Sequence, residues 1–136
     1  MALMASQGSP QPAHGATRLI LFAHGSRDPR WRAPFERLEA DLGATLGDAR
    51  VRLAYMEFVG PTLLDRAAEA VRDGVTGLRV LPLFLSAGAH VAQDIPAQVA
   101  EARARHPGLR IEVLQPIGEH PRFAALLREV AREAAG

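Results

Sequence analysis

Four short apolar segments of the chain each precede a longer segment in which apolar residues recur every three or four positions. Short apolar runs are typical of strands covered on both faces, and the longer pattern is typical of amphipathic helices. Parallel strands need right-handed crossover connections, so the alternation predicts an α/β fold: a single four-stranded parallel sheet with helices on both faces. Strands are expected at residues 17–23, 50–57, 78–85 and 109–114, and helices at residues 31–46, 63–72, 95–105 and 121–134.

The order of the strands decides which strand ends lie together. The commonest order for such a chain is 2-1-3-4, and ligands then bind at the carboxyl edge of the sheet, at the switch point between the first and third strands. His24 follows the first strand, Glu57 ends the second, and His90 follows the third. We therefore expect these three side chains at one edge of the sheet.

The segment after the third strand is rich in small residues. Such residues let the backbone turn and a ligand approach closely, and they deliver His90 beyond the end of the strand. Asp94 is a good N-cap and Pro96 suits a first turn, so the third helix is expected to begin just after Asp94. The small residues are Ser86, Ala87, Gly88 and Ala89.

The two histidines and Glu57 suit an open metal site. Imidazole is the commonest protein ligand of divalent transition metals, and two imidazoles leave coordination positions for water or substrate. A nearby carboxylate can accept protons or add an oxygen ligand. Open coordination favours transfer or catalysis over a structural metal. A lone histidine after a strand is usually a capping or packing residue, so the convergence of three strand ends is what favours the metal site.

Composition limits the class of protein. The chain of 136 residues contains no cysteine, which excludes disulfides, a thiolate nucleophile and cysteine-ligated zinc or iron–sulfur sites. The 16 basic and 15 acidic residues nearly balance, so the charge gives no argument for nucleic acid or an anionic membrane. We expect a cytoplasmic protein. Residues 1–16 lack an apolar period and a secretory signal, which predicts a flexible tail before one domain at residues 17–136.

Four motifs in order resemble the short sirohydrochlorin chelatases, the small form of the class II chelatase family. The resemblance runs from residue 17 to the C-terminus, and its specificity lies in the combination. The motifs are Ala-His-Gly-Ser-Arg-Asp-Pro at residues 23–29, Glu57 followed by Gly-Pro-Thr at residues 60–62, Gly-x-His-x-x-x-Asp-Ile-Pro at residues 88–96, and Gly-Glu-His-Pro at residues 118–121.

The resemblance implies insertion of a divalent metal ion into sirohydrochlorin, on the route to cobalamin, sirohaem or a nickel cofactor. Cobalt is the first choice, with iron and nickel as alternatives, and the metal is a substrate, so no prosthetic group is expected. The family's metal-binding histidines correspond to His24 and His90, and its acidic residue near the metal corresponds to Glu57. Short members resemble one half of longer two-lobed chelatases, which implies a homodimer.

Metal insertion makes definite chemical demands. The macrocycle loses two N–H protons as the dication enters, so a chelatase needs a metal donor and a proton acceptor close by. Glu57 would accept or relay these protons. Sirohydrochlorin carries many carboxylates, which Arg27 and the backbone N–H groups around Ser26 and residues 86–89 could bind.

Two other functions remain open. A strand followed by His-Gly-Ser also occurs in histidine phosphatases, but there an arginine precedes the nucleophilic histidine, whereas Ala23 precedes His24 here. A non-catalytic metal or tetrapyrrole carrier could use the same residues, and only turnover separates it from a chelatase. Arg27 could also pair with Asp28 or Glu57 instead of substrate, and His120 could contact substrate or cap the last helix.

Overall fold

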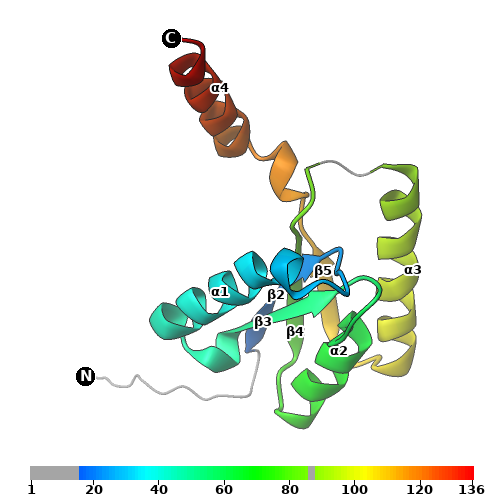
Figure 1. Cartoon of the computed structure of the whole chain (residues 1–136). Helices are drawn as coiled ribbons and strands as arrows, with labels where there is room; N and C mark the ends of the chain where they lie inside the picture. The colour runs from blue at the N-terminus through cyan, green and yellow to red at the C-terminus, as the bar shows by residue number, and fades with distance from the viewer. Residues whose placement is uncertain (1–15, 86–87) are drawn as a thin grey trace.

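The computed structural model describes residues 16–85 and 88–136, and for residues 89–92 it describes the backbone alone. Four strands form one parallel sheet in the order β3-β2-β4-β5 (Figure 1). The first strand therefore lies between the second and the third, which confirms the predicted order. The strands are β2 (Thr17–Ala23), β3 (Val51–Tyr55), β4 (Gly77–Pro82) and β5 (Arg110–Val113).

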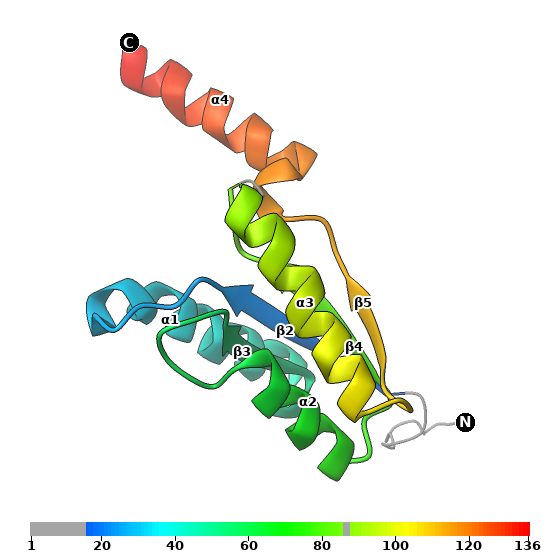
Figure 2. The same ribbon diagram turned by 90° about the vertical axis from the view of Figure 1, so that its right-hand side faces the viewer.

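Helices cover both faces of the sheet, as predicted. Figure 2 shows α2 and α3 on one face and α1 on the other. Across residues 16–85 and 88–136, no helix combines the length and the apolar character needed to cross a membrane. The helices are α1 (Pro29–Leu46), α2 (Leu63–Arg72), α3 (Ala89–Arg105) and α4 (Pro121–Ala135), with short 3-10 turns η1 (Asp48–Arg50) and η2 (Ile117–Glu119).

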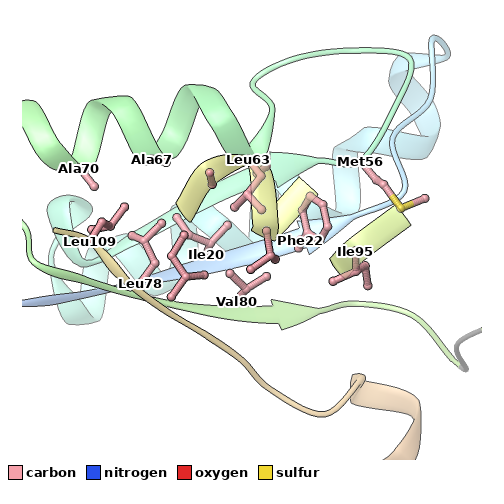
Figure 3. Close-up of a cluster of buried hydrophobic side chains, with 14 of the residues drawn as sticks. Ile20, Phe22, Met56, Leu63, Ala67, Ala70, Leu78, Val80, Ile95 and Leu109 are labelled. Atoms are coloured by element: carbon pink, nitrogen blue, oxygen red, sulfur yellow. The ribbon is translucent and has the colours of Figure 1, made fainter. Parts of the chain in front are cut away.

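The hydrophobic core has two layers because successive side chains of a strand point to opposite faces. Ile20 and Phe22 of β2 point toward α2 and α3, and Leu21 points toward α1. Figure 3 shows the larger layer, in which Leu63 of α2 and Ile95 of α3 meet the strand residues. Both layers hold β2 at the centre of the sheet, so its carboxyl end is a rigid platform.

The start of α3 differs from the prediction. Gly88 is the N-cap, so the helix begins six residues earlier than expected, and Asp94 and Pro96 lie inside it. A proline removes one helical hydrogen bond, but the buried residues Ile95 and Val99 on either side hold the segment against the core. His90 consequently lies in the first turn of α3 and not in a loop.

The last helix, α4, extends away from the sheet and the other helices (Figures 1 and 2). None of its residues is buried, and Leu126, Leu127 and Val130 are 53%, 56% and 52% exposed. These residues recur with Phe123 at helical spacing, which gives α4 a continuous apolar stripe. Within the described part of the chain, α4 packs chiefly against η2. Among the described residues, the stripe therefore has no large apolar surface to cover it.

Candidate functional site

The carboxyl ends of β2 and β3 bring His24 and Glu57 together. Parallel pairing continues beyond the strands, because the Met56 N–H donates to the Ala23 carbonyl at 2.8 Å and the Glu57 N–H donates to the His24 carbonyl at 3.0 Å. The backbones of the two predicted site residues are thus hydrogen-bonded neighbours at the open edge of the sheet. Glu57 is half-buried and His24 is exposed.

Gly25 makes this close approach possible. Its φ of +95° is a conformation that favours glycine, and a Cβ added there would collide with the Glu57 carbonyl oxygen and lie 3.1 Å from the Tyr55 Cβ. The glycine of the His-Gly-Ser motif therefore serves to lay the turn after β2 directly against the end of β3.

The His24 imidazole packs against the aromatic ring of Phe84. Its ring centroid lies 4.3 Å from that of Phe84, with 51° between the ring planes. Phe84 follows β4, is 3% exposed and also meets Phe22 edge-on at 6.4 Å. The contact restrains the imidazole, while its exposed part can reach a ligand.

Arg32 of α1 holds the turn after His24 in place. Its Nη1 donates to the Ser26 carbonyl at 2.8 Å and to the Arg27 carbonyl at 3.2 Å. Inside the turn, the Ser26 Oγ accepts a hydrogen bond from the Asp28 N–H at 3.0 Å. Arg32 is not among the site residues predicted from the sequence. A signal existed, because a cation in the first turn of a helix opposes the helix dipole and is thus expected to have a specific partner.

Arg27 points to an aromatic side chain and not to Asp28. Its guanidinium carbon lies 5.0 Å from the ring centroid of Phe58, within the range of a cation–π contact. Asp28 pairs instead with Arg30, at 2.7 Å between Oδ2 and Nη2, and caps α1 by accepting the Arg30 N–H. The side-chain hydrogen bond from Arg30, followed by the backbone one, holds the pKa of Asp28 below its ordinary value.

A cavity of about 170 Å³ lies behind His24, between the turn and α1. At its base the Tyr55 hydroxyl donates to the Glu36 Oε2 at 3.3 Å. Burial raises the pKa of Tyr55 to about 12, and the nearby Glu36 carboxylate adds to the shift, so the hydroxyl keeps its proton at neutral pH. Pockets for drug-sized ligands hold about 300–1,000 Å³. A large ligand must therefore lie over the open edge and not inside this cavity.

The residues predicted on the third strand's side lie at and before the start of α3. Ser86 and Ala87 lie outside the described residues, Gly88 is the exposed N-cap of α3, and Ala89 begins the helix. His90 is placed by its backbone in the first turn. Among the side chains described, no three histidine, aspartate or glutamate residues gather as a metal site. That set does not include the His90 side chain, so its pairing with His24 stays a prediction.

His120 caps a helix. Its Nδ1 accepts the Arg122 N–H at 3.1 Å, which makes it the N-cap of α4. Of the two roles considered for this residue, capping is the one observed. Nearby, the Gly118 N–H donates to the Phe84 carbonyl at 2.9 Å. This bond holds the N-terminal end of α4 close to Phe84, the residue against which His24 packs.

Comparisons with curated proteins identify sirohydrochlorin cobaltochelatases and sirohydrochlorin ferrochelatases. A sirohydrochlorin cobaltochelatase from Sulfurisphaera tokodaii is 31% identical, over 85% of this chain and 91% of its own length. A sirohydrochlorin cobaltochelatase from Methanococcoides burtonii is 28% identical, over 85% of this chain and 94% of its own length. The chain therefore matches these relatives along nearly their full length.

Solved structures agree. A CbiX protein of cobalamin (vitamin B12) biosynthesis from Marinobacter aquaeolei VT8 superposes with a TM-score of 0.77 and 37% identity, covering 92% of this chain and 96% of that one. The sirohydrochlorin chelatase SirB from Bacillus subtilis subspecies spizizenii, in complex with cobalt, gives a TM-score of 0.73 and 26% identity, covering 87% of this chain and 50% of that one. The CbiX family model matches residues 18–134. The resemblance carried by the four motifs is thus confirmed, and the chain belongs to the CbiX family.

Proposed function

We propose that this protein inserts a divalent metal ion, cobalt before iron or nickel, into sirohydrochlorin. The observation that carries the proposal is the backbone hydrogen bond from the Glu57 N–H to the His24 carbonyl, which places both residues at the open edge of the sheet. Relatives of the chain are named sirohydrochlorin cobaltochelatases. Edges of this kind, at the switch point of an α/β sheet, are where such folds bind ligands.

In this proposal the metal ion is a substrate that the imidazoles of His24 and His90 hold. Two imidazoles leave labile positions, so water ligands exchange for the pyrrole nitrogens of the macrocycle. Each dication that enters displaces two protons from those nitrogens. Glu57 lies beside His24 and accepts these protons or passes them to water. The exposure of His24 suits an ion that must arrive from solvent and leave with the product.

Carboxylates on the substrate need cationic and N–H partners. Arg27 is exposed at the same edge, and its charge is not taken by Asp28, which pairs with Arg30. We assign Arg27, the N–H groups around Ser26 and the segment 86–89 to the substrate carboxylates. Arg32, which holds the carbonyls of Ser26 and Arg27, is a positioning residue for this contact.

The proposal includes a homodimer that works in the cytoplasm. The cavity beside His24 is too small to enclose a tetrapyrrole, and the chain covers only 50% of the SirB chain. A second copy would supply the missing surface. The apolar stripe of α4 supports this assembly, since its base is fixed next to the site by the bond between Gly118 and Phe84. A second copy that covered the stripe would thus also approach the bound ring.

The test begins with cobalt binding, measured by calorimetry on the wild type and on His24→Ala and His90→Ala. We expect each variant to bind cobalt at least about tenfold more weakly and to remain folded. His106→Ala is the matched control, because His106 caps the other end of α3. Unchanged cobalt affinity in both site variants would contradict the assignment.

The second arm measures insertion into sirohydrochlorin by its absorbance change, with cobalt, iron and nickel in turn. Insertion by the wild type that is lost in His24→Ala but retained in His106→Ala would support the chelatase. Binding of metal and sirohydrochlorin with no catalysed insertion of any of the three metals would identify a carrier and refute it.

A further inference from the structure

Phe58 has an unfavourable backbone conformation although its side chain is not buried in the core. Its φ is +74°, and among the described residues it is the non-glycine residue with positive φ. A bulky side chain in this region is a conformational outlier with a free-energy cost. The ring remains 56% exposed, so burial in the core does not recover that cost.

The neighbours of Phe58 fix its position. Before it, the Glu57 N–H donates to the His24 carbonyl at 3.0 Å, and after it the Pro61 carbonyl accepts the Tyr55 N–H at 2.8 Å. Val59 packs against the core layer that faces α1. The loop between β3 and α2 (Figure 2) is thus held at both ends, with Phe58 exposed between the held residues. Glycine or asparagine would adopt this turn at lower cost, so the turn alone does not explain a phenylalanine.

The surroundings of the ring indicate what it could contact. Arg27, from the turn after β2, places its guanidinium carbon 5.0 Å from the ring centroid. An aromatic surface and a cation from two adjacent strand ends therefore stand together beside His24 and Glu57. This pair complements a ligand with a flat conjugated face and carboxylates at its edge, because aromatic rings pack against one another and guanidinium binds carboxylate.

We propose that Phe58 is a substrate-contacting residue, which packs against the macrocycle while Arg27 binds a carboxylate at the edge of that ring. The inference rests on the proposed function for the identity of the ligand. It goes beyond that function by assigning recognition of the flat face to a residue that neither binds metal nor moves protons. Substrate binding would then offset the conformational cost at Phe58.

The experiment compares Phe58→Asn with Phe58→Tyr. Binding of metal-free sirohydrochlorin is measured by quenching of its fluorescence, and thermal stability is measured in parallel. Asparagine tolerates positive φ, so we expect Phe58→Asn to melt at or above the wild-type temperature while binding sirohydrochlorin about 5- to 20-fold more weakly. Phe58→Tyr should bind within about twofold of wild type. Val71→Asn, at a 45% exposed apolar residue near the C-terminal end of α2, is the control and should not change binding.

Opposite effects on stability and binding are the signature of a contact made to the ligand. Unchanged sirohydrochlorin affinity in Phe58→Asn would overturn the inference, and so would a lower melting temperature, which would show that the ring serves the fold. The readout does not depend on metal insertion. If wild-type protein bound sirohydrochlorin but inserted no metal, the proposed function would fail, and weaker binding by Phe58→Asn would still support the contact.

Discussion

Replacing Gly25 by alanine should strain the contact between the ends of β2 and β3. The φ of +95° costs an L-residue about 1–2 kcal/mol. The new Cβ would also collide with the Glu57 carbonyl oxygen, and overpacking of this kind typically costs about 1–3 kcal/mol. The oxygen belongs to the backbone and cannot rotate away, so the strand end must move. We expect a loss of about 2–5 kcal/mol in the free energy of unfolding, the sum of these two costs.

Two other glycines separate the two costs. Gly47 has a φ of +103° and a ψ of 133°, but the nearest atom to an added Cβ is the Arg50 Cγ at 3.8 Å, so Gly47→Ala should lose only the backbone cost of about 1–3 kcal/mol. Gly108 has no atom within 4 Å of an added Cβ, and Gly108→Ala should change stability by less than about 0.5 kcal/mol. Urea unfolding of the three variants provides the measurement. Equal losses in Gly25→Ala and Gly47→Ala would refute the close approach of Gly25 to Glu57.

Three further predictions follow from the same structure. Glu57→Gln keeps the size of the side chain but loses its basicity, so metal insertion should slow by up to about 10²–10⁴-fold. Cobalt affinity, measured by calorimetry, should stay within about twofold of the wild type. An equal loss of insertion rate and cobalt affinity would identify Glu57 as a metal ligand. Leu127→Glu places a charge in the apolar stripe of α4 and should shift the protein toward monomer in sedimentation, whereas Ala125→Glu, on the opposite side of the helix, should not. The pKa of Tyr55 is raised to about 12, so the unfolded chain loses the Tyr55 hydroxyl proton before the folded protein does as the pH rises. The free energy of unfolding should therefore fall between about pH 10 and 12. Tyr55→Phe should remove this dependence on pH.

The fold could be predicted because its signals repeat along the chain. The strands β2 and β3 are buried on both faces, and each crossover helix shows one apolar stripe, so both kinds of element leave a recognisable sequence pattern. The first strand was predicted with its observed bounds, Thr17–Ala23. The start of α3 was missed because Asp94 and Pro96 are local capping signals. Contacts between residues distant in sequence override these local signals, because Ile95 and Val99 pack in the core against the sheet and the helix continues through Asp94 and Pro96.

The candidate site was predictable only in part, for a similar reason. Strand order alone brings His24 to Glu57, so residue position and topology were enough there. The contacts of Arg32 with the Ser26 and Arg27 carbonyls depend on how α1 leaves the turn, and the left-handed Phe58 depends on how the next loop is held at both ends. Neither follows from a sequence pattern of fixed period. The last helix was predicted, but its sequence does not say which surface covers the apolar stripe that the structure shows on it.

The held backbone and the exposed side chain of His24 suit a metal ion that is a substrate and leaves with the product. A structural metal site is closed by protein ligands and holds its ion permanently. At this edge the backbone is held by the hydrogen bond from the Glu57 N–H to the His24 carbonyl and by Arg32, whereas the His24 side chain is exposed and contacts Phe84. In the proposed site, a side chain on a fixed backbone that stays open to solvent would bind an ion and still release it. Insertion requires that combination, because the macrocycle must take the ion away at every turnover.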